Sequence, residues 1–88
     1  RGLEANLNSV VRLRNTVVDN NVTGIDIGAQ SSVQFMSNNT VSNNQIGMVC
    51  SQSGAYHAWL PQTFSGNTTQ VQSNAGCHAY LQYGVTIP

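Results

Sequence analysis

The sequence repeats at intervals of about 23 residues, a period typical of proteins built from stacked coils, and this repeat restricts the possible folds more than any other feature. A pattern of polar-Asn-Asn-x-x-Gly-apolar residues covers 19–25, recurs at 42–48 and falls again, less completely, on 65–71. Its second asparagine is Asn21, Asn44 and Asn67 in turn, and these three positions are equally spaced. In such repeats each unit stacks on its neighbour to bury a shared core.

Apolar residues keep the same step and alternate with polar ones inside each repeat. Alternation over 11–14, 25–27 and 33–35 predicts short strands with one buried face. A hairpin meander would also alternate, but only stacked coils require equivalent residues to form ladders about 4.8 Å apart. The apolar sets that share a phase are Val18, Val41 and Phe64; Ile25, Met48 and Val71; Val10, Val33 and Tyr56; and Leu13, Met36 and Trp59.

We therefore predict an all-β fold, a right-handed parallel β-helix (solenoid) of about three coils with a C-terminal β cap. The coils are expected over residues 1–73. Residues 74–88 are expected to form a cap or subunit contact, because Pro61 interrupts the third repeat and the apolar tail departs from the pattern. The asparagine ladder is expected at a sharp corner, where asparagine tolerates the left-handed backbone and stacked amides bond from coil to coil.

The composition argues against several classes of partner. Charged residues make up 7% of the 88 residues, lysine is absent, and the formal net charge is zero. A nucleic-acid partner is not expected, because the chain has no basic face to displace counterions from phosphates. A membrane span is not expected either, since no apolar run approaches the ~20 residues that it requires. The chain starts at Arg1 with no visible signal peptide, so we expect a processed product or an excised piece of something longer.

No cofactor and no metal site are expected. The chain has two histidines, His57 and His78, and no CxxC-type ligand pair, whereas metal sites usually need three or four donors. Cys50 and Cys77 could pair in an oxidising compartment, but we expect two small buried thiols.

In residues 15–27 and 39–48 the chain resembles the coil repeat of pectate-lyase-like parallel β-helix proteins. These segments read NTVVDNNVTGIDI and NTVSNNQIGM, and the resemblance covers about residues 2–73. The group includes polysaccharide lyases, epimerases, and bacteriophage tailspike and tail-fibre domains. The low charge and the polar, uncharged surface are most similar to viral fibre proteins. The matching residues carry no catalytic motif, so the resemblance implies a fold and no catalytic residues.

The candidate catalytic residues are Glu4 and Asp26, which hold the same phase because each follows a Gly-apolar pair. If their apolar neighbours point inward, both carboxylates point outward from adjacent coils. They would then lie about 5 Å apart, the separation that retaining glycosidases use. The alternative is two solvated surface acids, neutralised by Arg1 or by other groups.

The candidate ligand-binding residues are expected to form two outward-facing rows. An exposed indole together with amide and guanidinium donors suits a sugar ring, with Trp59 as the anchor. The alternative is that Trp59 packs under the loop at Pro61 or against a neighbouring subunit. The first row is Arg12, Gln34 and His57, and the second is Arg14, Met36 and Trp59.

Three hypotheses of function follow. The first is a structural, carbohydrate-binding segment of a phage tailspike, tail fibre or surface adhesin, placed in the virion tail or at an extracellular surface. The second is a fragment of a polysaccharide lyase or glycoside hydrolase that uses Glu4 and Asp26. The third is an assembly module with no ligand beyond its own copies. The scarcity of acids favours the first over an enzyme. We also expect a homo-oligomer, because so few coils bury little surface, and the fibre resemblance implies a trimer.

Overall fold

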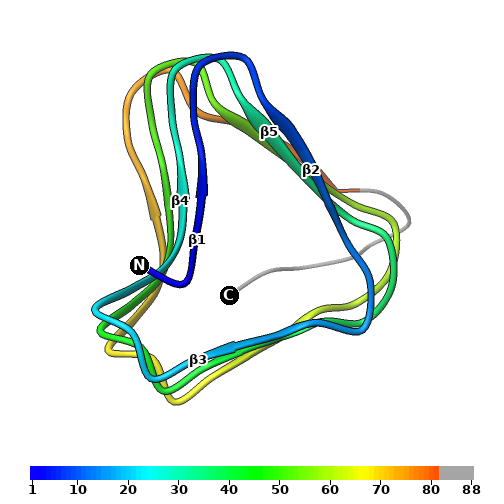
Figure 1. Cartoon of the computed structure of the whole chain (residues 1–88), viewed down its shortest axis with the longest axis vertical. Coiled ribbons are helices and arrows are strands. Elements are labelled where there is room, and N and C mark those ends of the chain that lie inside the picture. Colours follow the sequence, from blue (N-terminus) through cyan, green and yellow to red (C-terminus); the bar gives the residue numbers. More distant parts are fainter. Residues whose placement is uncertain (82–88) are drawn as a thin grey trace.

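The chain winds into a solenoid of triangular cross-section (Figure 1). The computed structural model describes residues 1–81, which contain strands and no helix, so the predicted all-β class is confirmed. None of these residues belongs to a helix with the length and apolar character needed to cross a membrane. The strands are β1 (Leu3–Ala5), β2 (Val10–Leu13), β3 (Val17–Asp19), β4 (Thr23–Ile27), β5 (Ser32–Phe35), β6 (Thr40–Ser42), β7 (Ile46–Cys50), β8 (Ala55–Ala58), β9 (Thr63–Ser65), β10 (Thr69–Ser73) and β11 (His78–Leu81).

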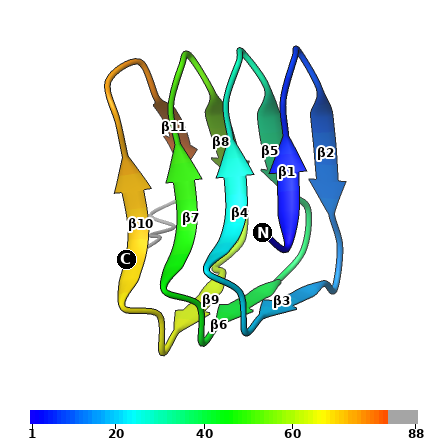
Figure 2. The ribbon, with the colours of Figure 1, turned by 60° about the vertical axis from the view of Figure 1, so that its left-hand side comes forward.

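Three parallel sheets form the walls of the triangle. Sheet A has the strand order β1-β4-β7-β10, sheet B has β2-β5-β8-β11, and sheet C has β3-β6-β9. Each coil contributes one strand to each sheet, so the strands make three coils followed by two strands of a fourth (Figure 2). Seen along the axis in Figure 1, the chain runs clockwise as it recedes from the first coil. The solenoid is therefore right-handed, as predicted.

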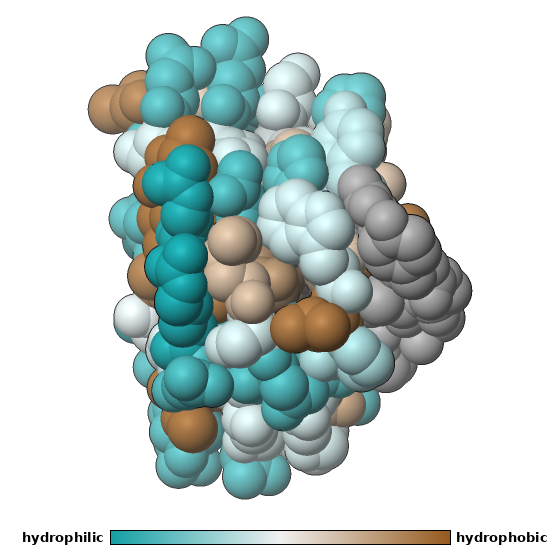
Figure 3. Space-filling view, turned by 90° about the vertical axis from the view of Figure 1, so that its right-hand side faces the viewer, coloured by the Kyte–Doolittle hydropathy of each residue, from teal (hydrophilic) through white to brown (hydrophobic). Residues whose placement is uncertain are grey.

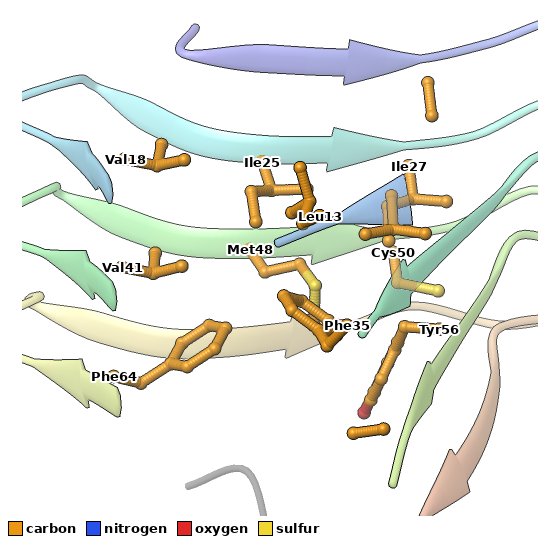
Figure 4. Close-up of a cluster of buried hydrophobic side chains, with 13 residues drawn as sticks. Leu13, Val18, Ile25, Ile27, Phe35, Val41, Met48, Cys50, Tyr56 and Phe64 are labelled. Carbon is orange, nitrogen blue, oxygen red and sulfur yellow. The ribbon is translucent and has the colours of Figure 1, made fainter. Parts of the chain in front are cut away.

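The core consists of columns of stacked side chains (Figure 4). Alternate residues of each strand point inward, and the side chains stack because parallel strands keep them in register. Phe35 and Phe64 meet edge to face, with their ring centroids 6.1 Å apart. Two of the four predicted sets form columns through three coils: Val18, Val41 and Phe64 in sheet C, and Ile25, Met48 and Val71 in sheet A.

The step between the first two coils is one residue shorter in sheets A and B than the step between the coils that follow. The missing residue lies in the corner after β2, where residues 14–16 connect two strands that 36–39 connect in the next coil. Corner residues absorb this difference because they lie outside the paired strands. The predicted grouping of Val10 with Val33, and of Leu13 with Met36 and Trp59, was therefore wrong. The inward columns of sheet B are Val11, Val33 and Tyr56, and Leu13, Phe35 and Ala58.

The predicted asparagine ladder lies at the corner between sheets C and A. The Oδ1 atom of Asn44 accepts a hydrogen bond from the backbone N–H of Asn21, at 2.9 Å. The Oδ1 atom of Asn67 accepts bonds from both the backbone and the side-chain N–H of Asn44, each at 2.9 Å. The expected left-handed backbone falls one residue earlier than predicted. The left-handed residues are Asn20, Asn43 and Gly66.

A second amide ladder, at the corner between sheets B and C, was not predicted. The Oδ1 atom of Asn39 accepts a bond from the backbone N–H of Thr16, and Oε1 of Gln62 accepts bonds from both N–H groups of Asn39. The expectation that Pro61 interrupts the coil was wrong. Pro61 lies in this corner, where no sheet bond is needed from its nitrogen, and β9 keeps its register with β6.

Cys50 and Cys77 form a disulfide, so the expectation of two free thiols was wrong. Their separation of 27 residues is slightly longer than one coil. One turn of the solenoid therefore brings Cys77, just before β11, beside Cys50 at the end of β7, with their Cα atoms 5.5 Å apart. The bridge joins the fourth coil to the third.

Strand β11 lies in the segment expected to form a cap. It pairs in parallel with β8, so it continues sheet B as the terminal strand, and all four of its residues are exposed. The rest of that segment, residues 82–88, lies outside the described residues. The division of the chain into coils and cap stays a prediction.

Candidate functional site

The outer face of sheet B collects the residues predicted to bind a ligand. Arg12 pairs in register with Gln34, Gln34 with His57, and His57 with Tyr80, so the four side chains form one outward row about 4.8 Å apart from strand to strand. Arg14, Met36 and Trp59 directly follow β2, β5 and β8 and flank that row. Figure 3 shows this face, with a strongly hydrophilic strip at one edge and less polar residues beside it.

Stacked rings occupy the C-terminal half of this face. The imidazole of His57 lies nearly parallel to the indole of Trp59 and to the phenol ring of Tyr80, with centroid distances of 5.9 and 4.7 Å. His78 stacks in turn on Tyr80 at 6.3 Å. Trp59 keeps 36% of its surface exposed and stacks on His57.

Charge is unevenly distributed between the faces. Arg12 and Arg14 are exposed on the sheet B side, and neither has an ion-pair partner among residues 1–81. The three acids of the chain lie on other walls: Glu4 and Asp26 belong to sheet A, and Asp19 ends a strand of sheet C. The sheet B face therefore combines two guanidinium groups and two imidazoles with no described carboxylate.

The two candidate catalytic carboxylates also lie together, on the outer face of sheet A. Glu4 pairs in register with Asp26 across β1 and β4. Arg1 reaches both of them: its guanidinium is 3.0 Å from an Asp26 oxygen and 3.8 Å from a Glu4 oxygen. A concavity of about 260 Å³ adjoins the pair, and Ser51 and Gln52 are among the other residues that line it. The two acids are in register, and Arg1 makes the ion pair expected under the alternative; a catalytic role for Glu4 and Asp26 stays a prediction.

Sequence reasoning missed Tyr80 and His78 as members of the sheet B face. The signal was present, because Tyr80 follows His57 at the repeat interval, but the residues after Ser73 had been assigned to a cap. Within the part of the chain that the structure describes, no three His, Cys, Asp or Glu residues lie close enough to hold a metal ion.

Comparisons with models of protein families, with curated proteins and with solved structures find no match to this chain. The fold and the two sites are therefore interpreted from their own geometry.

Proposed function

We propose that this chain is a structural β-solenoid segment whose sheet B face binds an anionic carbohydrate. The observation that carries the proposal is the gathering of Arg12, Arg14, His57 and Trp59 on one flat wall from which the acids are absent. Guanidinium groups bind carboxylate or sulfate groups through paired hydrogen bonds. A sugar bearing such groups therefore matches this wall better than a neutral sugar does.

The stacked rings support the same proposal. Each ring in the series Trp59, His57, Tyr80 is held by its neighbour, so little side-chain freedom would be lost when a ligand binds. Gln34 lies between the arginine and the ring portions of the row and adds an amide donor and acceptor. Together these groups offer charge, hydrogen bonds and apolar contact along one line across the coils.

An extracellular or virion-surface location agrees with this function. The disulfide between Cys50 and Cys77 is of a kind that persists in oxidising environments and is rare in reducing ones. The resemblance to tailspike and tail-fibre repeats, and the trimer that it implies, belong to the proposal as well. A virion tail or a cell surface is where such a module would meet a polysaccharide.

The test is calorimetric titration of the chain with oligosaccharides of a polyuronic acid and of a sulfated polysaccharide, with neutral dextran as the comparison. Arg12→Ala and Arg14→Ala are each expected to weaken binding by about tenfold, because each removes a charge-assisted hydrogen bond. Arg1→Ala is the matched control, since it removes the same charge from the sheet A side. Equal binding to dextran, or an equal loss in Arg1→Ala, would refute the proposal.

A second candidate function is cleavage of a glycan by Glu4 and Asp26. The observation that favours it is their pairing in register beside a concavity. The ion pair from Arg1 favours a structural role instead. Release of reducing ends or unsaturated products from a polysaccharide, abolished by both Glu4→Gln and Asp26→Asn, would support the enzyme. Turnover that persists in both variants would exclude this pair.

A further inference from the structure

A glycine column runs beside the asparagine ladder. Gly24 and Gly47 stand at the same place in successive coils, three residues after Asn21 and Asn44. A Cβ atom at Gly24 would lie 2.6 Å from the carbonyl oxygen of Gly47, and one at Gly47 would lie 2.5 Å from that of Gln70. Both distances are too short for carbon and oxygen, so this position must be glycine wherever another coil stacks above it.

Gln70 occupies the same position in the fourth coil. It follows Asn67 by three residues, as Gly24 and Gly47 follow their asparagines. Its Cβ atom therefore points to the place where a further coil would put its backbone carbonyl. In a coil stacked on β10 in the same register, a backbone carbonyl oxygen would lie about as close to the Cβ atom of Gln70 as the 2.5 and 2.6 Å found for the two glycines.

The side chain of Gln70 also makes two of the hydrogen bonds that a ladder asparagine on a further coil would make. Inside the ladder, Nδ2 of Asn44 donates to Oδ1 of Asn67, and Nδ2 of Asn67 donates to the carbonyl of Val41. At the last rung, Nδ2 of Asn67 donates to Oε1 of Gln70, at 2.5 Å. Nε2 of Gln70 then donates to the carbonyl of Phe64, at 3.2 Å.

Phe64 stands one coil beyond Val41 in the same column, so the amide of Gln70 makes two of the contacts that a ladder asparagine on a further coil would make. Unsatisfied amide and carbonyl groups at a solenoid end attract further strands. A side chain that satisfies them and also occupies the space of the next backbone removes that attraction.

We infer that Gln70 terminates the asparagine ladder and closes this corner of the solenoid to end-to-end stacking of a second copy of the chain. This inference rests on the ladder geometry alone and is independent of the proposed carbohydrate site.

Three variants of the full chain separate the two roles of Gln70. Gln70→Gly removes both the side-chain amide, which bonds Asn67 and Phe64, and the Cβ atom. Gln70→Ala removes the amide but keeps the Cβ atom. Gln72→Gly is the matched control, because Gln72 lies on the same strand, is exposed, and its side-chain amide donates a hydrogen bond to Asn74, outside the ladder. Far-UV circular dichroism establishes first that each variant is folded.

Hydrogen exchange of the Asn67 side-chain amide, followed by NMR, reports the cap. It is expected to accelerate about tenfold in Gln70→Ala and Gln70→Gly, because one hydrogen bond contributes roughly that factor, and to stay unchanged in Gln72→Gly. Unchanged exchange in Gln70→Ala would overturn the capping role, and this variant decides the point even where Gln70→Gly does not fold.

Sedimentation velocity tests whether the Cβ atom of Gln70 prevents a second copy from stacking on β10. Gln70→Gly alone is expected to form species whose mass grows with concentration, while wild type, Gln70→Ala and Gln72→Gly keep one mass. Association of Gln70→Ala to the same extent as Gln70→Gly would show that Cβ is not the barrier. A folded Gln70→Gly with the mass of wild type would overturn the inference.

Discussion

Replacing Asn44 by alanine tests the central rung of the ladder. Asn44 is 3% exposed. Its Oδ1 atom accepts the backbone N–H of Asn21, and its Nδ2 atom donates to the carbonyl of Val18 and to Oδ1 of Asn67. Asn67 keeps a second donor, the backbone N–H of Asn44. Asn44→Ala therefore leaves the backbone N–H of Asn21 without its partner and removes one donor from the carbonyl of Val18.

The unpaired N–H of Asn21 and the hydrogen bonds lost to Val18 and Asn67 are together expected to lower the free energy of unfolding by about 2–3 kcal/mol in Asn44→Ala. In a chain of this length that corresponds to a fall in Tm of roughly 10–20 °C. Urea and thermal denaturation followed by circular dichroism measure it. Gln45→Ala is the control: it changes the next residue, which is exposed, and is expected to stay within about 0.5 kcal/mol.

Asn44→Asp sharpens the test because it preserves shape and changes only the donor. A carboxylate at this place would face the carbonyl of Val18 and Oδ1 of Asn67, so the fold favours the protonated form, which can still donate. The pKa of the introduced group then lies above that of free aspartate. The variant is stable below the unfolded pKa and loses stability as the pH rises through the folded pKa. A neutral Asn44→Ala together with a pH-independent Asn44→Asp would refute the ladder argument.

Three further predictions follow from the packing. Replacing both Cys50 and Cys77 by alanine should lower the free energy of unfolding by about 3–4 kcal/mol, the loop-entropy value for a bridge of this span, and equal urea midpoints with and without the bridge would contradict it. Gly24→Ala should destabilise by about 3 kcal/mol through the clash with the next carbonyl, whereas Gly28→Ala, whose new Cβ would meet nothing closer than 3.6 Å, should be nearly neutral in the same denaturation assay. The isolated chain should sediment as an oligomer at micromolar concentration; a folded monomer would contradict this, and a dimer would contradict only the trimer.

The sequence alone was sufficient for the architecture. In a stacked coil each residue has nearly the same surroundings as its equivalent one turn away. Packing therefore requires similar side chains at equivalent positions, and the sequence repeats. For this reason Val18, Val41 and Phe64 could be assigned to one column, and Asn21 and Asn44 to one ladder, before any coordinates were considered. The outward row on sheet B could be predicted for the same reason as far as His57.

Only the tertiary structure showed the length of the corner after β2, the disulfide and the role of Gln70. The corner after β2 is one residue shorter than its counterpart, and this changed the partners of Val10 and Met36, because a shift of one residue moves a side chain to the other face of a sheet. The disulfide joins Cys50, at the end of β7, to Cys77, just before β11, so the pairing does not follow the repeat interval. In the sequence Gln70 only departs from the glycine of the repeat, and the hydrogen bonds of its side chain show that it caps Asn67. Periodicity therefore determined the strands and the asparagine ladder, because stacking places equivalent residues side by side, whereas the length of a corner and the disulfide depend on contacts that the repeat does not specify.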